Sequence, residues 1–162
     1  MRNVWFKKVA EKYGWMGNMA PYPIKYDGKV WLTSEALFQG MRYDDEDIKE
    51  IIRKEKSPMG AKMKAKKYKD QMVVIPMSPQ DVKNMKKCVK MKFDQHPQLK
   101  KELMNTKDAF LYEDIGNRKG ERHKFWGAKK ISENEGEGQN MMGRILMELR
   151  DEYLTSKTYN LR

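Results

Sequence analysis

The sequence has 162 residues, enough for one domain with a buried core, and carries 34 Lys and Arg against 23 Asp and Glu. Its formal net charge of +11 favours an anionic partner (nucleic acid, a phosphorylated small molecule or an acidic membrane surface), although lysine can also serve solubility alone. With one cysteine and two histidines, the chain has no intramolecular disulfide, and we expect neither a metal site nor a cofactor.

Membrane and export signals are absent from the sequence pattern. The first fifteen residues lack the apolar segment of a signal peptide. No apolar run approaches the roughly 20 residues that a membrane-spanning helix needs. We therefore expect a cytoplasmic protein without a membrane partner.

The first predicted elements are a β-hairpin and a helix. Two β-prone runs within residues 22–33 flank Asp27-Gly28, the dipeptide that a type I′ turn favours. Thr33 or Ser34 then offers an N-cap for a helix that reaches about Tyr43.

Four helices are expected next, each with its own start signal. They begin at Asp44 or Asp45, at Ser57-Pro58, at Ser78-Pro79, and at Pro97 with an end near Asn105. Apolar side chains at helical spacing predict their core: Ile48, Ile51 and Ile52, then Val82, Met85, Val89 and Phe93.

A strand and a last helix complete the expected fold. Residues 108–114 alternate like a half-buried strand, and a polar loop follows over residues 115–122. The last helix runs from about Asn140 to Leu154, with a core face of Met142, Ile145, Leu146, Leu149 and Tyr153. We predict a single helix-rich α+β domain with a small sheet over residues 1–155, and a flexible tail over 156–162.

Glu35 is the first candidate for chemistry. On a helix it shares a face with Gln39 and Arg42, at i, i+4 and i+7. An acid, an amide and a guanidinium beside aromatic residues suit a pocket for a sugar or a phosphate, and the helix dipole favours negative charge at Glu35. An exposed amphipathic helix with an acidic first turn explains the same pattern.

Further candidates lie near the last helix. Glycines precede Asn140, and helix-start amides after such a loop can bind phosphate, although glycine is also common near helix caps. Gly143, inside that helix, indicates close packing more than close approach of a ligand.

The segment from Tyr112 to Ala128 and a lysine-rich helix supply the remaining candidates. Glu113 and Asp114 end a strand, and Trp126 suits either base stacking or the core. His123 suits an ordinary loop. Lys62 could contact phosphate or, if desolvated, act as an amine nucleophile; a solvated cationic helix is the alternative.

Taken together, these segments resemble the NADAR (YbiA-like) family. The resemblance rests on six blocks in order, over roughly residues 14–154: "GNMAPYPIKYDGKVWLTSEALFQGMRY", "SPMGAKMKAKK", "MKKCVKMKFDQHPQLKKELMNT", "YED", "FWGA" and "GQNMMGRILMELR". It implies helices around a small sheet and an N-glycosidase that cleaves between a ribose carbon and a nitrogen. Two substrate classes are associated with the family: ribosylamino-pyrimidine phosphate intermediates of riboflavin synthesis, and ADP-ribose attached to guanine in nucleic acid.

The resemblance also implies site residues. Position by position, the resemblance carries over to Glu35, Gln39, Lys62, Trp126, Gly127, Asn140 and Gly143. Together with the other candidates, we expect catalytic residues at Glu35, Lys62 and Asp114. We expect substrate-binding residues at Asn18, Gln39, Arg42, Glu113, Arg118, Trp126, Gly127, Asn140 and Gly143. The chain departs from the family pattern at three positions. Many members have histidine in place of Ala36 and lysine in place of Arg42, and some have aspartate in place of His123.

The mechanism expected from these residues centres on charge. Cleavage develops positive charge at the anomeric carbon, which Glu35 would stabilise while orienting water. Glu113 or Asp114 would position ribose hydroxyls or share proton transfer, and Arg42, Arg118 and the helix start at Asn140 would hold phosphates. A Schiff base on Lys62 is a second route.

We therefore expect removal of ADP-ribose from guanine in nucleic acid or nucleotides, with nucleic acid as a further partner. The alternatives are cleavage of the riboflavin intermediates, or a non-catalytic module that binds ADP-ribose or nucleic acid.

Overall fold

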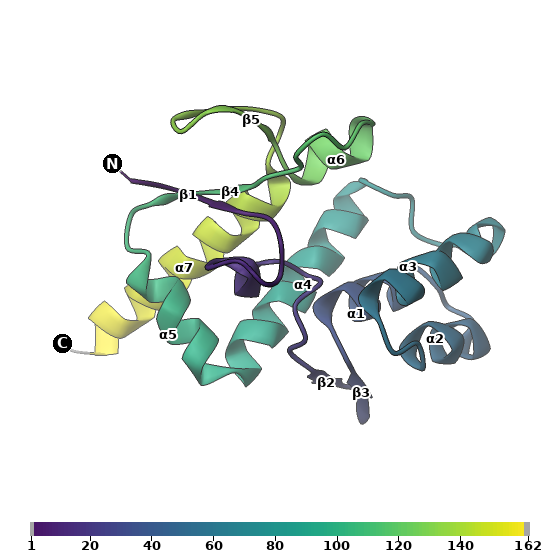
Figure 1. The fold of residues 1–162 in the computed structure, drawn as a ribbon. Coiled ribbons are helices and arrows are strands. Elements are labelled where there is room, and N and C mark those ends of the chain that lie inside the picture. The colour runs from purple at the N-terminus through teal and green to yellow at the C-terminus, as the bar shows by residue number, and fades with distance from the viewer. Residues whose placement is uncertain (1, 161–162) are drawn as a thin grey trace. The chain divides into compact units, whose positions relative to one another are not determined.

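The structure is a computed structural model that describes residues 2–160, and it divides into two compact units. Asn18–His96 form unit 2, and the flanking segments Met1–Gly17 and Pro97–Arg162 form unit 1 (Figure 1). The mixture of helices and small sheets confirms the expected α+β class.

Unit 2 contains a hairpin followed by four α-helices, close to the prediction. Its elements are β2 (Ile24–Tyr26), β3 (Lys29–Trp31), α1 (Ser34–Gly40), α2 (Glu46–Arg53), α3 (Pro58–Lys67), the 3-10 helix η2 (Lys69–Gln71) and α4 (Pro79–Gln95). The antiparallel β2–β3 hairpin turns at Asp27 and Gly28, with φ of 52° and 74°, as a type I′ turn requires. All four expected start signals hold, since side chains of Thr33, Asp45, Ser57 and Ser78 accept backbone N–H bonds at their N-caps.

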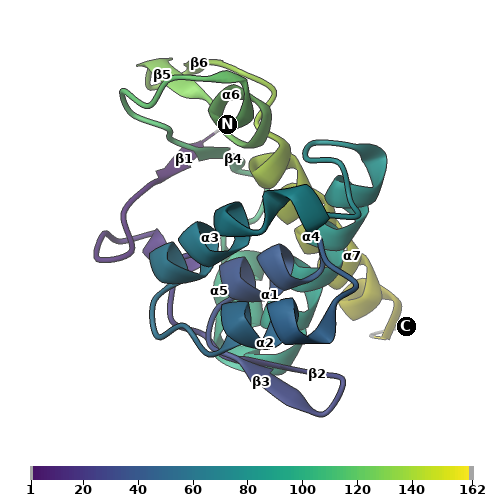
Figure 2. The same cartoon turned by 90° about the vertical axis from the view of Figure 1, so that its right-hand side faces the viewer.

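Helix α1 is the centre of unit 2, because it packs against α2, α3 and α4 (Figure 2). All seven of its residues are buried, so the exposed amphipathic helix considered from the sequence is wrong. The helix ends at Gly40, earlier than the expected Tyr43. Backbone bonds from Arg42 to Gln39 and from Tyr43 to Gly40 tighten the chain there, as at many helix ends.

The buried stripes of α2 and α4 agree with the helical spacing in most positions. Ile48, Ile52, Met85, Val89 and Phe93 are buried, whereas Ile51 and Val82 are partly exposed.

In unit 1, a parallel pair of strands joins the N-terminal segment to the segment that follows unit 2. Its elements are β1 (Asn3–Phe6), the 3-10 helix η1 (Gly14–Met16), α5 (Pro97–Asn105), β4 (Phe110–Glu113), α6 (Glu121–Trp126), β5 (Lys129–Ser132), β6 (Glu135–Glu137) and α7 (Met141–Asn160). Strand β1 pairs with β4, and β4 packs on α7 beside the β5–β6 hairpin (Figure 1). The buried side of the pair consists of Val4, Phe6 and Leu111.

The sequence analysis missed strand β1, helix α6 and both strands of the β5–β6 hairpin in unit 1. Strand β1 finds its partner more than 100 residues away, which no local pattern reveals. Helix α6 occupies the end of the expected loop over residues 115–122 and buries no residue, so it has no apolar stripe to detect. The β5–β6 hairpin is almost wholly exposed and equally lacks alternation.

Helix α7 confirms the predicted core face, since Met142, Ile145, Leu146, Leu149 and Tyr153 are all buried. The helix extends beyond its expected end at Leu154 to Asn160, so the first part of the expected tail over 156–162 is helical. Residues 161–162 lie outside the described residues.

Candidate functional site

Glu35 lies in the first turn of α1, and the chain around it is built to hold that turn in place. The side chain of Thr33 caps the helix by accepting the N–H of Ala36 at 3.1 Å. Asn18 braces the same turn: its carbonyl accepts the N–H of Glu35 at 3.2 Å, and its Oδ1 accepts the Ser34 hydroxyl at 2.8 Å. The predicted residue Asn18 is thus next to Glu35, where it fixes the helix start.

The Glu35 carboxylate is nearly buried, at 8 % exposure, yet among the described residues only one of its oxygens has a hydrogen-bond partner. The Gln39 amide donates to Oε1 at 2.9 Å. Oε2 accepts no hydrogen bond from any residue in the range 2–160. It is also not one of the fully buried side-chain atoms that lack a hydrogen-bond partner. A carboxylate with one oxygen fixed and the other open can stabilise positive charge or orient a water molecule.

Arg42 continues the same line of side chains, as the i, i+4, i+7 spacing predicted. Its guanidinium donates from Nε and Nη2 to the two oxygens of Asp81, at 2.9 and 2.7 Å. Nη1 donates to the Gln39 oxygen at 3.4 Å, and the group lies 4.5 Å from the centre of the Phe38 ring. The arginine expected to hold phosphate therefore has a bidentate protein partner.

Asp81 itself was missed by sequence reasoning, which treated it as part of a helix-start signal. Its side chain is fully buried, and its Oδ2 also accepts the N–H of Met77 at 2.8 Å. The fold brings together residues 39 positions apart, which the sequence could not reveal.

Lys62 projects from α3, which packs against α1 within unit 2. It is partly exposed, and within the described part of the chain it forms neither an ion pair nor a side-chain hydrogen bond. Its ammonium group is thus available for either of the predicted roles.

The predicted residues of unit 1 gather where β4 ends against the start of α7. Asn140, with φ of 52°, uses its side-chain amide to hold the strand: Oδ1 accepts the N–H of Glu113 at 3.0 Å and Nδ2 donates to the carbonyl of Leu111 at 2.8 Å. A Cβ on Gly143 would lie 2.1 Å from that same carbonyl oxygen. Gly143 therefore serves close packing, the reading that the sequence favoured.

Trp126 is the last residue of α6, and Gly127 follows it at the same strand end. A Cβ on Gly127 would lie 2.6 Å from the carbonyl oxygen of Glu113, so glycine permits this close approach. The Trp126 ring is partly exposed and meets Phe125 edge-on at 4.9 Å.

Asp114 and Arg118 are both engaged in the loop after β4. The Asp114 carboxylate accepts the N–H of Gly116 at 2.8 Å, which is an Asx turn. Arg118 folds back onto backbone carbonyls of Ile115 and Asp114, at 3.0 and 3.3 Å. His123 is partly exposed within α6.

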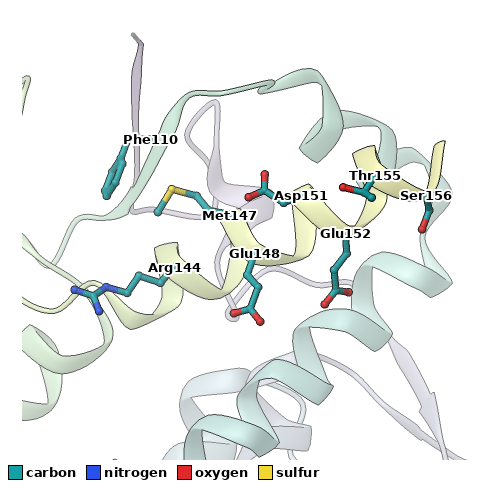
Figure 3. A pocket seen from close by; sticks show the side chains of 8 residues that line it. All are labelled: Phe110, Arg144, Met147, Glu148, Asp151, Glu152, Thr155 and Ser156. Atoms are coloured by element: carbon teal, nitrogen blue, oxygen red, sulfur yellow. The ribbon is translucent and has the colours of Figure 1, made fainter. Parts of the chain in front are cut away.

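A pocket of about 1040 Å³ opens along α7 in unit 1, and none of the predicted site residues lines it. It is lined by Phe110, Arg144, Met147, Glu148, Asp151, Glu152, Thr155 and Ser156, with Glu148 and Glu152 extending from the same side of the helix (Figure 3). Three carboxylates against one arginine make this pocket a poor place for a phosphorylated ligand.

Among the residues described there is no group of three or more His, Cys, Asp or Glu side chains placed to hold a metal ion. No helix in the described range is long and apolar enough to span a membrane.

The NADAR domain family matches residues 4–154, so the chain belongs to the NADAR family, as its sequence blocks indicated. The N-glycosidase YbiA of Escherichia coli is 36% identical over 154 residues, which are 94% of this chain and 89% of that protein. The expected enzyme class, an N-glycosidase, is thereby confirmed.

Two further matches bear on fold and substrate. The solved NMR structure of E. coli YbiA has a TM-score of 0.76 and 32% identity, covering 98% of this chain and 89% of that one. A riboflavin biosynthesis protein of Vibrio vulnificus is 28% identical over 158 residues, which are 98% of this chain but 40% of that protein.

Proposed function

We propose that this N-glycosidase removes ADP-ribose from guanine in nucleic acid or nucleotides. The observation that carries the proposal is the Glu35 carboxylate, nearly buried at a helix start, with Oε1 held by Gln39 and Oε2 open. A carboxylate held in this way supplies negative charge beside the anomeric carbon, where the oxocarbenium-like state develops positive charge.

The proposed reaction breaks the bond between C1 of the ribose and the base nitrogen. Water supplies a hydroxyl group to C1 and a proton to the departing nitrogen, so no redox partner is needed. Glu35 stabilises the cationic sugar and orients the water, and its position in the first turn of α1 adds the helix dipole to its stabilisation.

The net charge of +11 supports a polyanionic substrate. ADP-ribose carries two phosphates, and nucleic acid adds one per nucleotide. The assignments of Asp114 as a second catalytic group, and of Glu113, Arg118 and Trp126 as substrate-binding residues, stay predictions that belong to this proposal. A cytoplasmic location also belongs to it, since nucleic acid and nucleotides occur there.

A second candidate substrate is a ribosylamino-pyrimidine phosphate intermediate of riboflavin synthesis. It is favoured by one specific observation, the similarity to a protein named for riboflavin biosynthesis. Both candidates contain a ribose C1–nitrogen bond and phosphate, so the same carboxylate serves either one.

A side-by-side comparison of the two substrates tests the proposal. The full chain is incubated with an oligonucleotide bearing ADP-ribose on guanine and, separately, with the ribosylamino-pyrimidine phosphate, and the products are followed by liquid chromatography with mass spectrometry. We expect release of ADP-ribose and unmodified guanine. Activity on the pyrimidine alone would overturn the substrate assignment, and binding of ADP-ribose without any release would overturn the enzymatic proposal.

A further inference from the structure

The Glu35 carboxylate is the last member of a line of hydrogen-bonded side chains that begins in a different helix. Asp81, in the first turn of α4, binds Arg42 through both carboxylate oxygens, at 2.9 and 2.7 Å. Arg42 donates to Gln39, which in turn donates to Glu35. The four side chains all belong to unit 2.

Asp81 is itself rigidly held. Its side chain has no exposed surface, and Oδ2 accepts the N–H of Met77 at 2.8 Å in addition to Arg42. The N–H of Asp81 donates to the capping hydroxyl of Ser78 at 3.3 Å. Because these donors hold the Asp81 carboxylate in place, the carboxylate fixes the position of the Arg42 guanidinium that it binds.

The planar guanidinium of Arg42 is held in one orientation, so that its position depends on that of Asp81. Two of its nitrogens face Asp81, one face lies over the Phe38 ring, and its side chain is 12% exposed. The remaining nitrogen, Nη1, faces the side-chain oxygen of Gln39 at 3.4 Å, the longest link of the line.

The contact with Arg42 determines which end of the Gln39 side-chain amide faces Glu35. An amide has one acceptor end and one donor end, and a guanidinium only donates. Because Oε1 of Gln39 accepts from Arg42, the donor Nε2 of Gln39 must face Glu35. There Nε2 donates to Oε1 of Glu35 at 2.9 Å. The reversed amide would place two donors against each other at Arg42 and two acceptors against each other at Glu35.

We propose that Asp81 is a positioning residue for the glycosidase reaction, acting through Arg42 and Gln39 to hold the Glu35 carboxylate with Oε2 open to substrate. The inference rests on the proposed function, because it assumes that Glu35 is the catalytic carboxylate. It gives Arg42 a role other than the phosphate contact expected from the sequence.

Kinetics of Asp81→Asn test the proposal, with Asp94→Asn as the matched control, because Asp94 is an exposed carboxylate on the same helix. We expect Asp81→Asn to lower kcat by roughly 10- to 100-fold with KM changed less than two-fold, since a misplaced catalytic group costs about that much. The control keeps the wild-type kcat. A raised KM with unchanged kcat would identify Arg42 as a phosphate ligand and overturn the proposal.

A double-mutant cycle checks the route through Gln39. If Asp81 acts through the amide, Asp81→Asn should cost less than two-fold in kcat in a chain that already carries Gln39→Ala. Effects that multiply would overturn the proposal, because a purely structural role of Asp81 would be independent of Gln39.

A second readout does not depend on turnover. The side-chain amide signal of Gln39 in a ¹H–¹⁵N NMR spectrum, identified by its loss in Gln39→Ala, should move toward the position of a free amide in Asp81→Asn. An unchanged signal would overturn the proposal. If the wild type cleaves neither N-riboside, the proposed function fails, while this signal still decides whether Asp81 orients Gln39.

Asp81→Asn leaves an arginine whose side chain is only 12% exposed without its anion, and this loss can prevent folding. The combination of Asp81→Leu with Arg42→Met replaces the pair by apolar side chains, an exchange that other buried pairs tolerate. We expect a folded protein with the same loss of kcat and the same shift of the Gln39 signal. Wild-type kcat in this folded variant would overturn the proposal.

Discussion

Asn140 holds Glu113 in place: its side-chain oxygen accepts the Glu113 N–H at 3.0 Å, while its amide nitrogen donates to Leu111 at 2.8 Å. The start of α7 and the end of β4 are thus joined through one side chain. Both residues were expected to bind substrate. The structure gives the Asn140 side chain two backbone partners within unit 1, so its amide supports the strand end that carries Glu113.

Replacing Asn140 by Asp tests this support. Aspartate keeps the acceptor for the Glu113 N–H and tolerates the positive φ, but it places a carboxylate oxygen against the Leu111 carbonyl in place of a donor. We expect the free energy of unfolding, measured by urea denaturation, to fall by about 1–3 kcal/mol. Asn134→Asp, at an exposed turn, is the control and should change it by less than about 0.5 kcal/mol. Equal stability of the two variants would contradict the account.

Gly143→Ala tests the close packing of α7 on β4. The added methyl group would lie 2.1 Å from the Leu111 oxygen. This oxygen belongs to the backbone, so it cannot move away without distorting β4. We expect a loss of about 1–3 kcal/mol in the free energy of unfolding, as for other overpacked positions. Gly17→Ala is the matched control, because its nearest atom would be 3.6 Å away, and it should be nearly neutral. A stable Gly143→Ala variant would show that this approach is loose.

The elements predicted from the sequence are those whose signals are local. Helix starts at Ser57 and Ser78 and the turn at Asp27 each depend on a few adjacent residues, and all three hold. The pairing of β1 with β4, and of Arg42 with Asp81, depends on residues far apart in the chain. The helical spacing correctly put Glu35, Gln39 and Arg42 on one face, but it could not supply the aspartate that binds the arginine.

Lys92 also escaped the sequence analysis, because a lysine in a lysine-rich helix suggests a solvated position. It is 1% exposed, and burial lowers its pKa from 10.5 to about 7. Between these values the unfolded chain binds a proton that the folded chain does not, so the contribution of Lys92 to stability rises with pH from about 7 to 10.5. Below that window both states are protonated and the charged form is disfavoured in the fold.

The free energy of unfolding of Lys92→Met should therefore exceed that of the wild type most at neutral pH. We expect the difference in unfolding free energy between the variant and the wild type to shrink as urea denaturation is repeated from pH 7 towards pH 10. Lys83→Met, at an exposed position of the same helix, should show no such trend. A difference that stays constant with pH would mean that Lys92 remains charged in the folded protein.

Lys62 separates the two chemical routes. If it attacked the opened ribose, reduction with borohydride during turnover would attach the sugar to Lys62 covalently. Because the charge of Glu35 drives the proposed reaction, we expect no adduct by mass spectrometry. We also expect Lys62→Arg to keep kcat within roughly ten-fold, with Lys66→Arg as an exposed control. A trapped adduct on Lys62 would establish the Schiff-base route.

The central claim is that Glu35 supplies the charge that drives cleavage, and Glu35→Gln tests it most directly. Glutamine keeps the size of the side chain and removes the charge. Glu46→Gln is the matched control, because Glu46 is also a first-turn acid of a helix but its side chain is 71% exposed. Release of ADP-ribose from a guanine-modified oligonucleotide should fall by roughly 10²- to 10⁴-fold in Glu35→Gln, with substrate affinity kept and the control unchanged. Activity of Glu35→Gln within a few-fold of the wild type would contradict the account.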